Sequence, residues 1–369
     1  MALSAQGQTA LQAFLANATE RSVSLPKRVT FGNGGDVVPL PHAGVPTMLV
    51  VNFAGSTTVT NGTTVGTVTA SPFWPYNLMA PSTLQDYQGN TRVYADGYQL
   101  YQRDLVIGTA RSPKGPFDTE AYSGEVYSAA IPSGVAGGSV TSPLNFSVAV
   151  PISLGSNTVL GSYPGAVPDG TANFILKENL PITGSNIDSP LTTSGSAKVS
   201  ISGKWSFNYV YLDAPNSVAI PVEALSYIHL FYQQNADSDQ LVAGGTPQQI
   251  LQTGETYYRI FLNLIINNQN IMSTSAPPID SLKFLVNSST PTVDWDFQTY
   301  LYLTRRYFNR DFPMLLYNFF DKPWAPNNYG SLTAQQKLTN NVTTGSYQQV
   351  VYTRETLLLP SGNQVAIGG

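Results

Sequence analysis

Aromatic and polar residues alternate most regularly over Lys204–Leu212. Every second position there carries an aromatic side chain: Trp205, Phe207, Tyr209 and Tyr211. The intervening face carries polar residues: Lys204, Ser206 and Asn208. Because successive side chains of a strand point to opposite faces, this pattern predicts a half-buried strand with its aromatic side in a core.

Shorter patterns of this kind recur along most of the chain, separated by Gly, Pro, Asn and Ser. We expect strands at Arg28–Phe31, Thr47–Phe53, Asn90–Val106, Lys198–Gly203, Ile220–Tyr232, Glu255–Asn267 and Tyr347–Leu359. In Glu255–Asn267 one predicted face carries Tyr258, Ile260, Leu262, Leu264 and Ile266, and the opposite face carries Tyr257, Arg259, Phe261 and Asn263. Regularly spaced strands with few helices are typical of sandwiches and barrels. The Pro-containing segment Asp213–Ser217 follows a core strand and marks the predicted boundary between two β domains.

Two segments follow helical spacing instead. Residues 3–18 place Leu11, Phe14, Leu15 and Ala18 on one face, which predicts a helix that docks onto a partner or onto its own domain. A second helix is predicted at residues 294–309, with an apolar side formed by Phe297, Tyr300, Leu301, Thr304 and Phe308. Asp294 and Asp296 in its first turn, and Arg305 and Arg306 in its last, suit the helix dipole.

Charged residues are scarce, at 11% of the 369 residues, against roughly 25% in an average soluble domain. Ser, Thr, Asn, Gln and Tyr supply the polar surface instead. A free monomer usually stays soluble through charge, so this composition favours a chain that packs against neighbouring subunits; a secreted β-protein is the alternative. The net charge of −4 argues against a large basic face and against direct, sequence-specific nucleic-acid binding.

Residues that carry catalysis are also scarce. The chain has no cysteine, which excludes disulfides and thiolate metal sites. His42 and His229 each lie in or beside a predicted strand, without a second histidine or an acidic cluster at metal-ligand spacing. Three further motifs have structural explanations: a polar loop at Asp237–Asp239, helix capping at Asp294 and Asp296, and a Gly-rich turn at Gly32–Asp36. We therefore expect no catalytic residue, no metal site, no cofactor and no enzyme activity.

Three short motifs follow the second predicted helix in order: Thr304-Arg305-Arg306, Asp311-Phe312-Pro313 and Asp321-Lys322-Pro323. The series resembles the C-terminal barrel of the tectivirus-type major capsid proteins, the double jelly-roll shell proteins of membrane-containing bacteriophages. Trp205–Asp213, Ile220–Tyr232, Tyr257–Ile266 and Tyr352–Leu357 are also similar to that family, so the resemblance covers about residues 204–359. The first half matches in layout, with Pro75–Arg103 as its best segment.

The motif residues also have their own physical chemistry. Pro313 prevents the chain from re-entering a helix. Arg305 and Arg306 can satisfy the last helical carbonyls or pair with Asp311 and Asp321. A solvated, charged helix end is the alternative.

The resemblance implies an all-β fold of two tandem eight-stranded jelly-roll barrels, with a short N-terminal helix and a helix in the second barrel. The corresponding divisions are a helical arm at residues 1–26, a first barrel at 27–213 and a second at 218–369. It further implies a major capsid protein of the virion, assembled in the host cytoplasm. Homotrimeric, pseudo-hexagonal capsomers would form an icosahedral shell over an internal membrane, with neighbouring capsomers and minor capsid and vertex proteins as partners.

Under this interpretation residues 1–26 form an assembly arm, whose apolar stripe comprises Leu3, Leu11, Phe14 and Leu15. Helices that lie on lipid usually carry Lys or Arg, and this segment carries none before Arg21, so we expect protein contact at the inner capsid surface. Deleting residues 1–20 is expected to leave trimers intact and to disturb shell assembly.

Two other classes of function remain open from the residues alone. A carbohydrate- or receptor-binding β-barrel, such as a spike or adhesin, could stack sugars on its many aromatic side chains. A glycoside hydrolase could use Asp294 and Asp296 as its acidic pair.

Overall fold

The structure is a computed structural model of the whole chain. It describes residues 4–111, 126–154, 159, 161–163, 165, 170–185, 188–227, 229–237, 241–251, 255–267, 269–273, 277–287, 290–308, 312, 314–319, 331–342 and 348–358. The chain divides into two compact units, the first ending at Tyr232 and the second beginning at Gln233.

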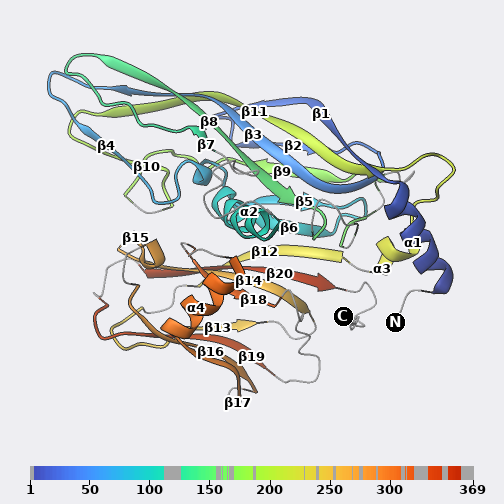
Figure 1. Cartoon of the computed structure of the whole chain (residues 1–369). Coiled ribbons are helices and arrows are strands. Elements are labelled where there is room, and N and C mark those ends of the chain that lie inside the picture. Colours follow the sequence, from blue (N-terminus) through green and yellow to red (C-terminus); the bar gives the residue numbers. More distant parts are fainter. Residues whose placement is uncertain are drawn as a thin grey trace. The chain divides into compact units, whose positions relative to one another are not determined.

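The first unit is built from two antiparallel sheets of four main strands each (Figure 1). One sheet has the order β1 (Thr19–Thr30), β11 (Lys198–Asp213), β3 (Val45–Thr60) and β8 (Ser139–Pro151), extended by the short strand β7 (Val126–Ser128). The other contains, in order, β6 (Thr91–Ala95), β5 (Ser82–Gln85), β9 (Asn173–Lys177) and β2 (Gly35–Pro39). The short strands β4 (Thr67–Ala70) and β10 (Leu191–Ser194) pair with each other.

Aromatic side chains from both sheets fill the first unit's core. Trp205 on β11 lies 4.8 Å from Phe53 and 5.7 Å from Phe146, measured between ring centroids. Phe207 on the same strand meets Phe174 of β9, in the facing sheet, at 6.1 Å. Trp205, Phe207 and Tyr209 are completely buried, which confirms the predicted inward face of β11. Tyr211 is only half-buried, because the register with β3 shifts between Val210 and Tyr211 and breaks the alternation.

Three helices and a 3-10 turn complete the first unit: α1 (Ala5–Asn17), η1 (Tyr76–Leu78), α2 (Gly97–Arg111) and α3 (Val222–Tyr227). The strand predicted over Asn90–Val106 is wrong beyond Ala95, where α2 begins after the capping residue Asp96. Tyr98, Gln99, Leu100, Gln102 and Arg103 are all buried, so α2 lacks the polar stripe that marks a surface helix. The strand predicted over Ile220–Tyr232 is α3 followed by β12 (His229–Asp237).

The domain limits differ from those expected from the sequence. The predicted boundary at Asp213–Ser217 lies too early in the chain. Leu225 of α3 still packs with Val45 and Leu212 of the first unit. The Tyr232 hydroxyl also donates to the Gln99 carbonyl of that unit at 2.6 Å. The predicted arm at residues 1–26 is too long, because β1 already begins at Thr19, which pairs with Asp213.

The second unit also places two antiparallel sheets around one core. One has the order β13 (Gln248–Leu251), β19 (Leu332–Leu338), β16 (Ile279–Val286) and β17 (Thr290–Asp296). The other contains β15 (Gln269–Asn270), β14 (Thr256–Ile266) and β20 (Gln348–Leu358), with β18 (Leu315–Asn318) also paired to β14. The turn η2 (Ile271–Ser273) follows β15, and α4 (Phe297–Phe308) follows β17.

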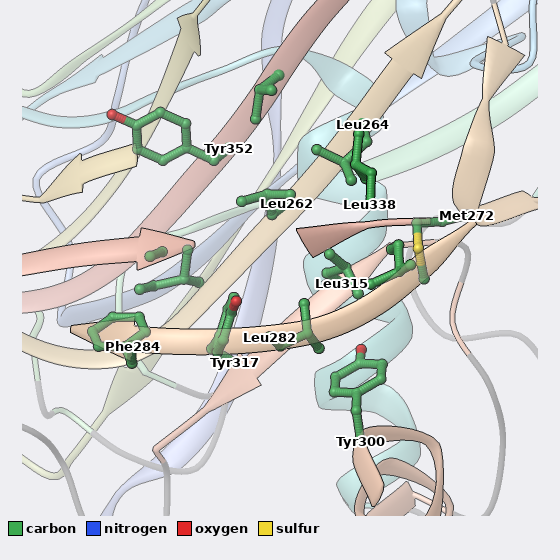
Figure 2. Close-up of a cluster of buried hydrophobic side chains, with 14 of the residues drawn as sticks. Leu262, Leu264, Met272, Leu282, Phe284, Tyr300, Leu315, Tyr317, Leu338 and Tyr352 are labelled. Atoms are coloured by element: carbon green, nitrogen blue, oxygen red, sulfur yellow. The ribbon is translucent and has the colours of Figure 1, made fainter. Parts of the chain in front are cut away.

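Figure 2 shows the second core, where Tyr300 of α4, Leu282 and Phe284 of β16, and Tyr317 of β18 gather beside β14. All eleven residues of β14 are buried. Its core face carries Tyr257 rather than the predicted Tyr258, followed by Ile260, Leu262, Leu264 and Ile266 as predicted. A register shift between Tyr257 and Arg259 causes this change of face.

Candidate assembly arm, motif region and buried charges

The helix α1 is anchored at its first turn to α3. Ser4 caps the helix by accepting a hydrogen bond from the Gly7 amide at 2.9 Å. The Ser4 amide and hydroxyl then donate to the two carboxylate oxygens of Glu223, at 2.9 and 2.7 Å. These two bonds hold the pKa of the Glu223 carboxyl below its ordinary value. Gly7 allows this close approach, because a Cβ there would lie 2.3 Å from a Glu223 oxygen.

The other anchor of α1 is an apolar contact near its C-terminal end. Phe14 is 1% exposed and packs in a cluster with Val45, Val159, Leu212 and Leu225 of the first unit. Leu11 is partly buried against the same cluster, whereas Leu15 is 41% exposed. Leu3 lies outside the described residues. The stripe is therefore divided: Phe14 holds α1 on its own unit, and Leu15 faces solvent.

The motif region begins on α4. Thr304 and Phe308 are buried, and Phe312 packs its ring edge-on against Phe308 with centroids 5.2 Å apart. Arg305 and Arg306 are exposed in the last turn. Asp311, Pro313, Asp321, Lys322 and Pro323 lie outside the described residues, so the predicted Arg–Asp pairing stays a prediction.

The two aspartates before α4 have separate structural contacts. The Asp296 carboxylate accepts from the Thr299 amide at 2.8 Å and from the Thr299 hydroxyl at 3.0 Å, and these bonds lower its pKa. The sequence predicted Asp294 in the first turn of the helix, and this is wrong. Asp294 lies in β17, where its carboxylate pairs with Lys283 at 3.0 Å. A capping carboxylate and a surface ion pair account for both residues, which removes the basis for a glycosidase pair.

Buried ion pairs were not predicted from the sequence. Arg259 on β14 pairs with Glu355 on β20, and Arg354 on β20 pairs with Glu255 at 3.3 Å. Burial raises the pKa of the Glu255 carboxyl, and the nearby Arg354 opposes that change. Arg354 and Glu355 lie in the C-terminal segment that resembles the capsid family. That resemblance was the only feature of the sequence that could have pointed to these ion pairs.

A further carboxylate closes the Gly-rich turn. Glu178 accepts from the Gly32 and Gly34 amides at 2.9 and 2.8 Å and from the Trp205 indole at 2.9 Å. Gly32, Gly34 and Gly35 have positive φ angles of 104°, 82° and 120°, which only glycine adopts easily. The predicted turn is therefore a structural joint that ties the start of β2 to β11.

Neutral hydroxyl groups pair across the exposed face of the β11-β3-β8 sheet. Thr58 lies 2.8 Å from Thr141, Thr60 lies 2.7 Å from Ser139, and Ser56 lies 3.1 Å from Ser202, measured between side-chain oxygens. The polar surface expected from the composition is formed here by hydroxyl groups that hydrogen-bond to one another. Neutral groups of this kind cost less to remove from water than charges.

Among the residues that the structure describes, no group of three or more His, Asp or Glu side chains could hold a metal ion. None of the helices in the described part of the chain is long and apolar enough to cross a membrane. Burial lowers the pKa of His229 to about 4, and the His42 ring lies 3.4 Å from the Thr171 hydroxyl.

Solved structures share this two-unit architecture along nearly the whole chain. The STIV MCP crystal structure aligns with a TM-score of 0.68 at 16% identity, covering 95% of this chain and 100% of that one. The chain has a double jelly-roll fold. The atomic structure of Sulfolobus Turreted Icosahedral Virus aligns with a TM-score of 0.62 at 16% identity, over 95% and 94% of the two chains.

The Faustovirus major capsid protein has the same fold at lower similarity. Its TM-score is 0.53 at 9% identity, with 93% of this chain and 90% of that chain covered. No family model and no curated protein matches this chain. The double jelly roll therefore extends through the first half of the chain, where the sequence resembled the capsid family in layout only.

Proposed function

We propose that this chain is a major capsid protein that assembles into an icosahedral virion shell. The observation that carries the proposal is the double jelly-roll fold, shared over 95% of the chain and the full length of the STIV MCP. The independent series Thr304–Arg306, Asp311–Pro313 and Asp321–Pro323 supports it, because it resembles the same class of shell protein.

The shell-building unit is a homotrimer. Three chains with two barrels each place six barrels in one block, and a near-hexagonal outline of that kind tiles a shell. The 11% charge content supports subunit contacts, because few charges need to be desolvated when surfaces meet. The hydroxyl pairs around Thr58 and Thr141 are one face with this property. Interfaces of permanent assemblies bury on the order of 2,000 to 5,000 Å².

The finer assignments rest on the family resemblance. They are a shell over an internal membrane, minor capsid and vertex proteins as partners, location in the virion and assembly in the host cytoplasm. The net charge of −4 supports a shell that encloses its genome without binding it directly. Leu15, exposed on a helix that Phe14 anchors, is the residue of the arm best placed to contact a neighbouring capsomer.

Light scattering and negative-stain microscopy of the purified chain test the proposal. The expected result is a trimer at micromolar concentration that appears as uniform blocks or as shells. A folded β-rich protein that remains a monomer at that concentration would contradict it.

A glycan array distinguishes the adhesin alternative. The Tyr and Trp residues that motivated that alternative include Trp205, Tyr209 and Tyr232, which are fully buried and unable to stack on sugars. We expect no specific glycan binding by the trimer.

A further inference from the structure

A buried arginine of the first unit uses only one of its nitrogens in hydrogen bonds. Arg92 on β6 donates from Nε to Asp86 Oδ2 at 2.7 Å, and both side chains are almost fully buried. The pair is end-on, so the two terminal NH2 groups of Arg92 point elsewhere. Neither of them has a hydrogen-bond partner in the structure.

The Asp86 carboxylate is already satisfied by its own loop. Its Oδ1 accepts from the Gln88 and Asn90 amides at 3.0 and 2.9 Å, and its Oδ2 also accepts from Asn90 Nδ2 at 3.3 Å. The negative charge is thus shared among four donors, counting Arg92 Nε. The two terminal NH2 groups of Arg92 make no hydrogen bond to this loop.

Two neighbouring tyrosines carry further unpaired groups: Tyr163 lies beside Arg92, and Tyr209 is close enough to Tyr163 to interact with it electrostatically. The Tyr163 and Tyr209 hydroxyls are buried without a hydrogen-bond partner, as are both Arg92 NH2 groups. The guanidinium carbon of Arg92 lies 5.9 Å from the centre of the Tyr163 ring and 5.4 Å from that of Phe231. Burial raises the pKa of Tyr163 and of Tyr209, so both hydroxyls stay protonated and can donate.

An orphaned group of this kind is costly. A guanidinium cannot lose its proton at physiological pH, and each unpaired buried donor keeps the full cost of its removal from water. Ring faces compensate part of the charge but accept no strong hydrogen bond. The cluster is rich in donors and poor in acceptors, and His229, whose pKa is lowered to about 4, adds no charge at neutral pH. The species that completes it is an acceptor, small enough for a packed interior.

We propose that the first unit binds a water-sized monoanion of the halide class, held by the Arg92 terminal nitrogens and the Tyr163 and Tyr209 hydroxyls. The site lies wholly within the first unit and does not depend on the proposed capsid function. The anion serves as a structural ligand that satisfies the buried donors, so its binding stabilises the folded chain.

Thermal unfolding of the purified protein, in whatever oligomer it forms, tests the proposal. Chloride is varied at constant ionic strength, with gluconate replacing it. Above the dissociation constant, each tenfold increase in chloride is expected to raise the Tm by about 3–5 °C. Tyr163→Phe and Tyr209→Phe remove one donor each, and each should move the onset of this rise to a chloride concentration several-fold higher. The matched control Tyr317→Phe removes a buried hydroxyl of the second unit, which accepts from Gln336, and should keep the onset where it is.

Crystals grown in bromide give a second measurement that needs no variant. An anomalous peak between Arg92 and Tyr163 is expected. An ordered water at that place, with no anomalous signal, would overturn the proposal. It would also be overturned by a Tm that does not distinguish chloride from gluconate, or by the same onset concentration of chloride in all three variants. If the variants fail to fold, the bromide map of the unaltered protein decides alone.

Discussion

Single aromatic residues carry much of the first unit's core. Phe207 is fully buried and meets Phe174 of the facing sheet, so truncating it leaves a cavity that β9 and β11 cannot easily close. We expect Phe207→Ala to lower the free energy of unfolding by about 3–5 kcal/mol, measured by urea denaturation. Ser206→Ala, on the other face of the same strand, is the control and should change it by less than ~1 kcal/mol. A loss below that limit for Phe207→Ala would mean that this face does not support the core.

His229 makes the stability of the first unit depend on pH. Its folded-state pKa is about 4 against an ordinary value of 6.5, because burial disfavours the charged ring. The unfolded chain therefore binds the proton more readily, and stability falls as pH drops from about 6.5 to about 4. Because the ring is only partly buried, water screens part of this effect, and we expect a loss on the order of 2 kcal/mol.

Denaturation at pH 7.5 and pH 4.5 measures this effect. His229→Gln removes the titrating ring, so the difference between the two pH values should shrink relative to the unaltered protein. An unchanged difference in His229→Gln would assign the acid sensitivity to other groups.

At the scale of the element, α1 is held by the hydrogen bonds between Ser4 and Glu223 and by the apolar contact of Phe14. Glu223 binds Ser4 as a carboxylate, and its pKa is lowered by those bonds. The stabilisation from these hydrogen bonds is therefore fully present above the ordinary carboxyl pKa, and it is lost as pH falls through the lowered pKa of Glu223. We expect Glu223→Gln to increase proteolytic release of α1 several-fold at pH 7 while the rest of the chain stays protected. Glu20→Gln, on the exposed part of β1, is the matched control.

Removing the whole helix tests its part in assembly. The deletion should end at residue 17, because Thr19 and Glu20 pair with Asp213 and Leu212 in β1 and a cut at residue 20 would damage that sheet. We expect the shortened chain to form trimers but irregular shells, judged by electron microscopy. Because the deletion also removes Phe14, the variant Phe14→Ala serves as a control. Regular shells from Phe14→Ala would show that assembly does not depend on the apolar contact of Phe14 alone. Normal shells from the deletion itself would show that the arm is dispensable.

At the scale of the whole molecule, the scarcity of charge decides how subunits can meet. Interfaces built from neutral polar and apolar groups do not weaken when salt screens charges, and the screening length is only about 3 Å at 1 M salt. We expect the proposed trimer to keep its mass by light scattering between 0.05 and 1 M NaCl. Dissociation in 1 M NaCl would instead point to interfaces held by ion pairs.

The local patterns of the sequence were sufficient where one face of an element meets the core and the other meets water. The alternation of β11 and the spacing of α1 and α4 predicted Trp205, Phe207, Phe14 and Tyr300 as inward-facing residues, and these are buried. The motifs around Thr304 gave the two-barrel architecture through resemblance, and the structural similarity confirms that architecture over 95% of the chain.

Only the tertiary structure decided the elements and contacts that depend on residues distant in sequence. The helix α2 is buried on all sides, so its sequence carries no amphipathic period, and packing against Tyr76 and β8 determines its state. The unit boundary, the change of face at Tyr257 and the exposure of Leu15 follow from register shifts and docking that no local pattern contains. The same holds for the cluster of Arg92, Tyr163 and Tyr209, which joins residues from separate strands and loops. Burial of a polar group depends on which distant segments cover it, and that is a property of the folded chain.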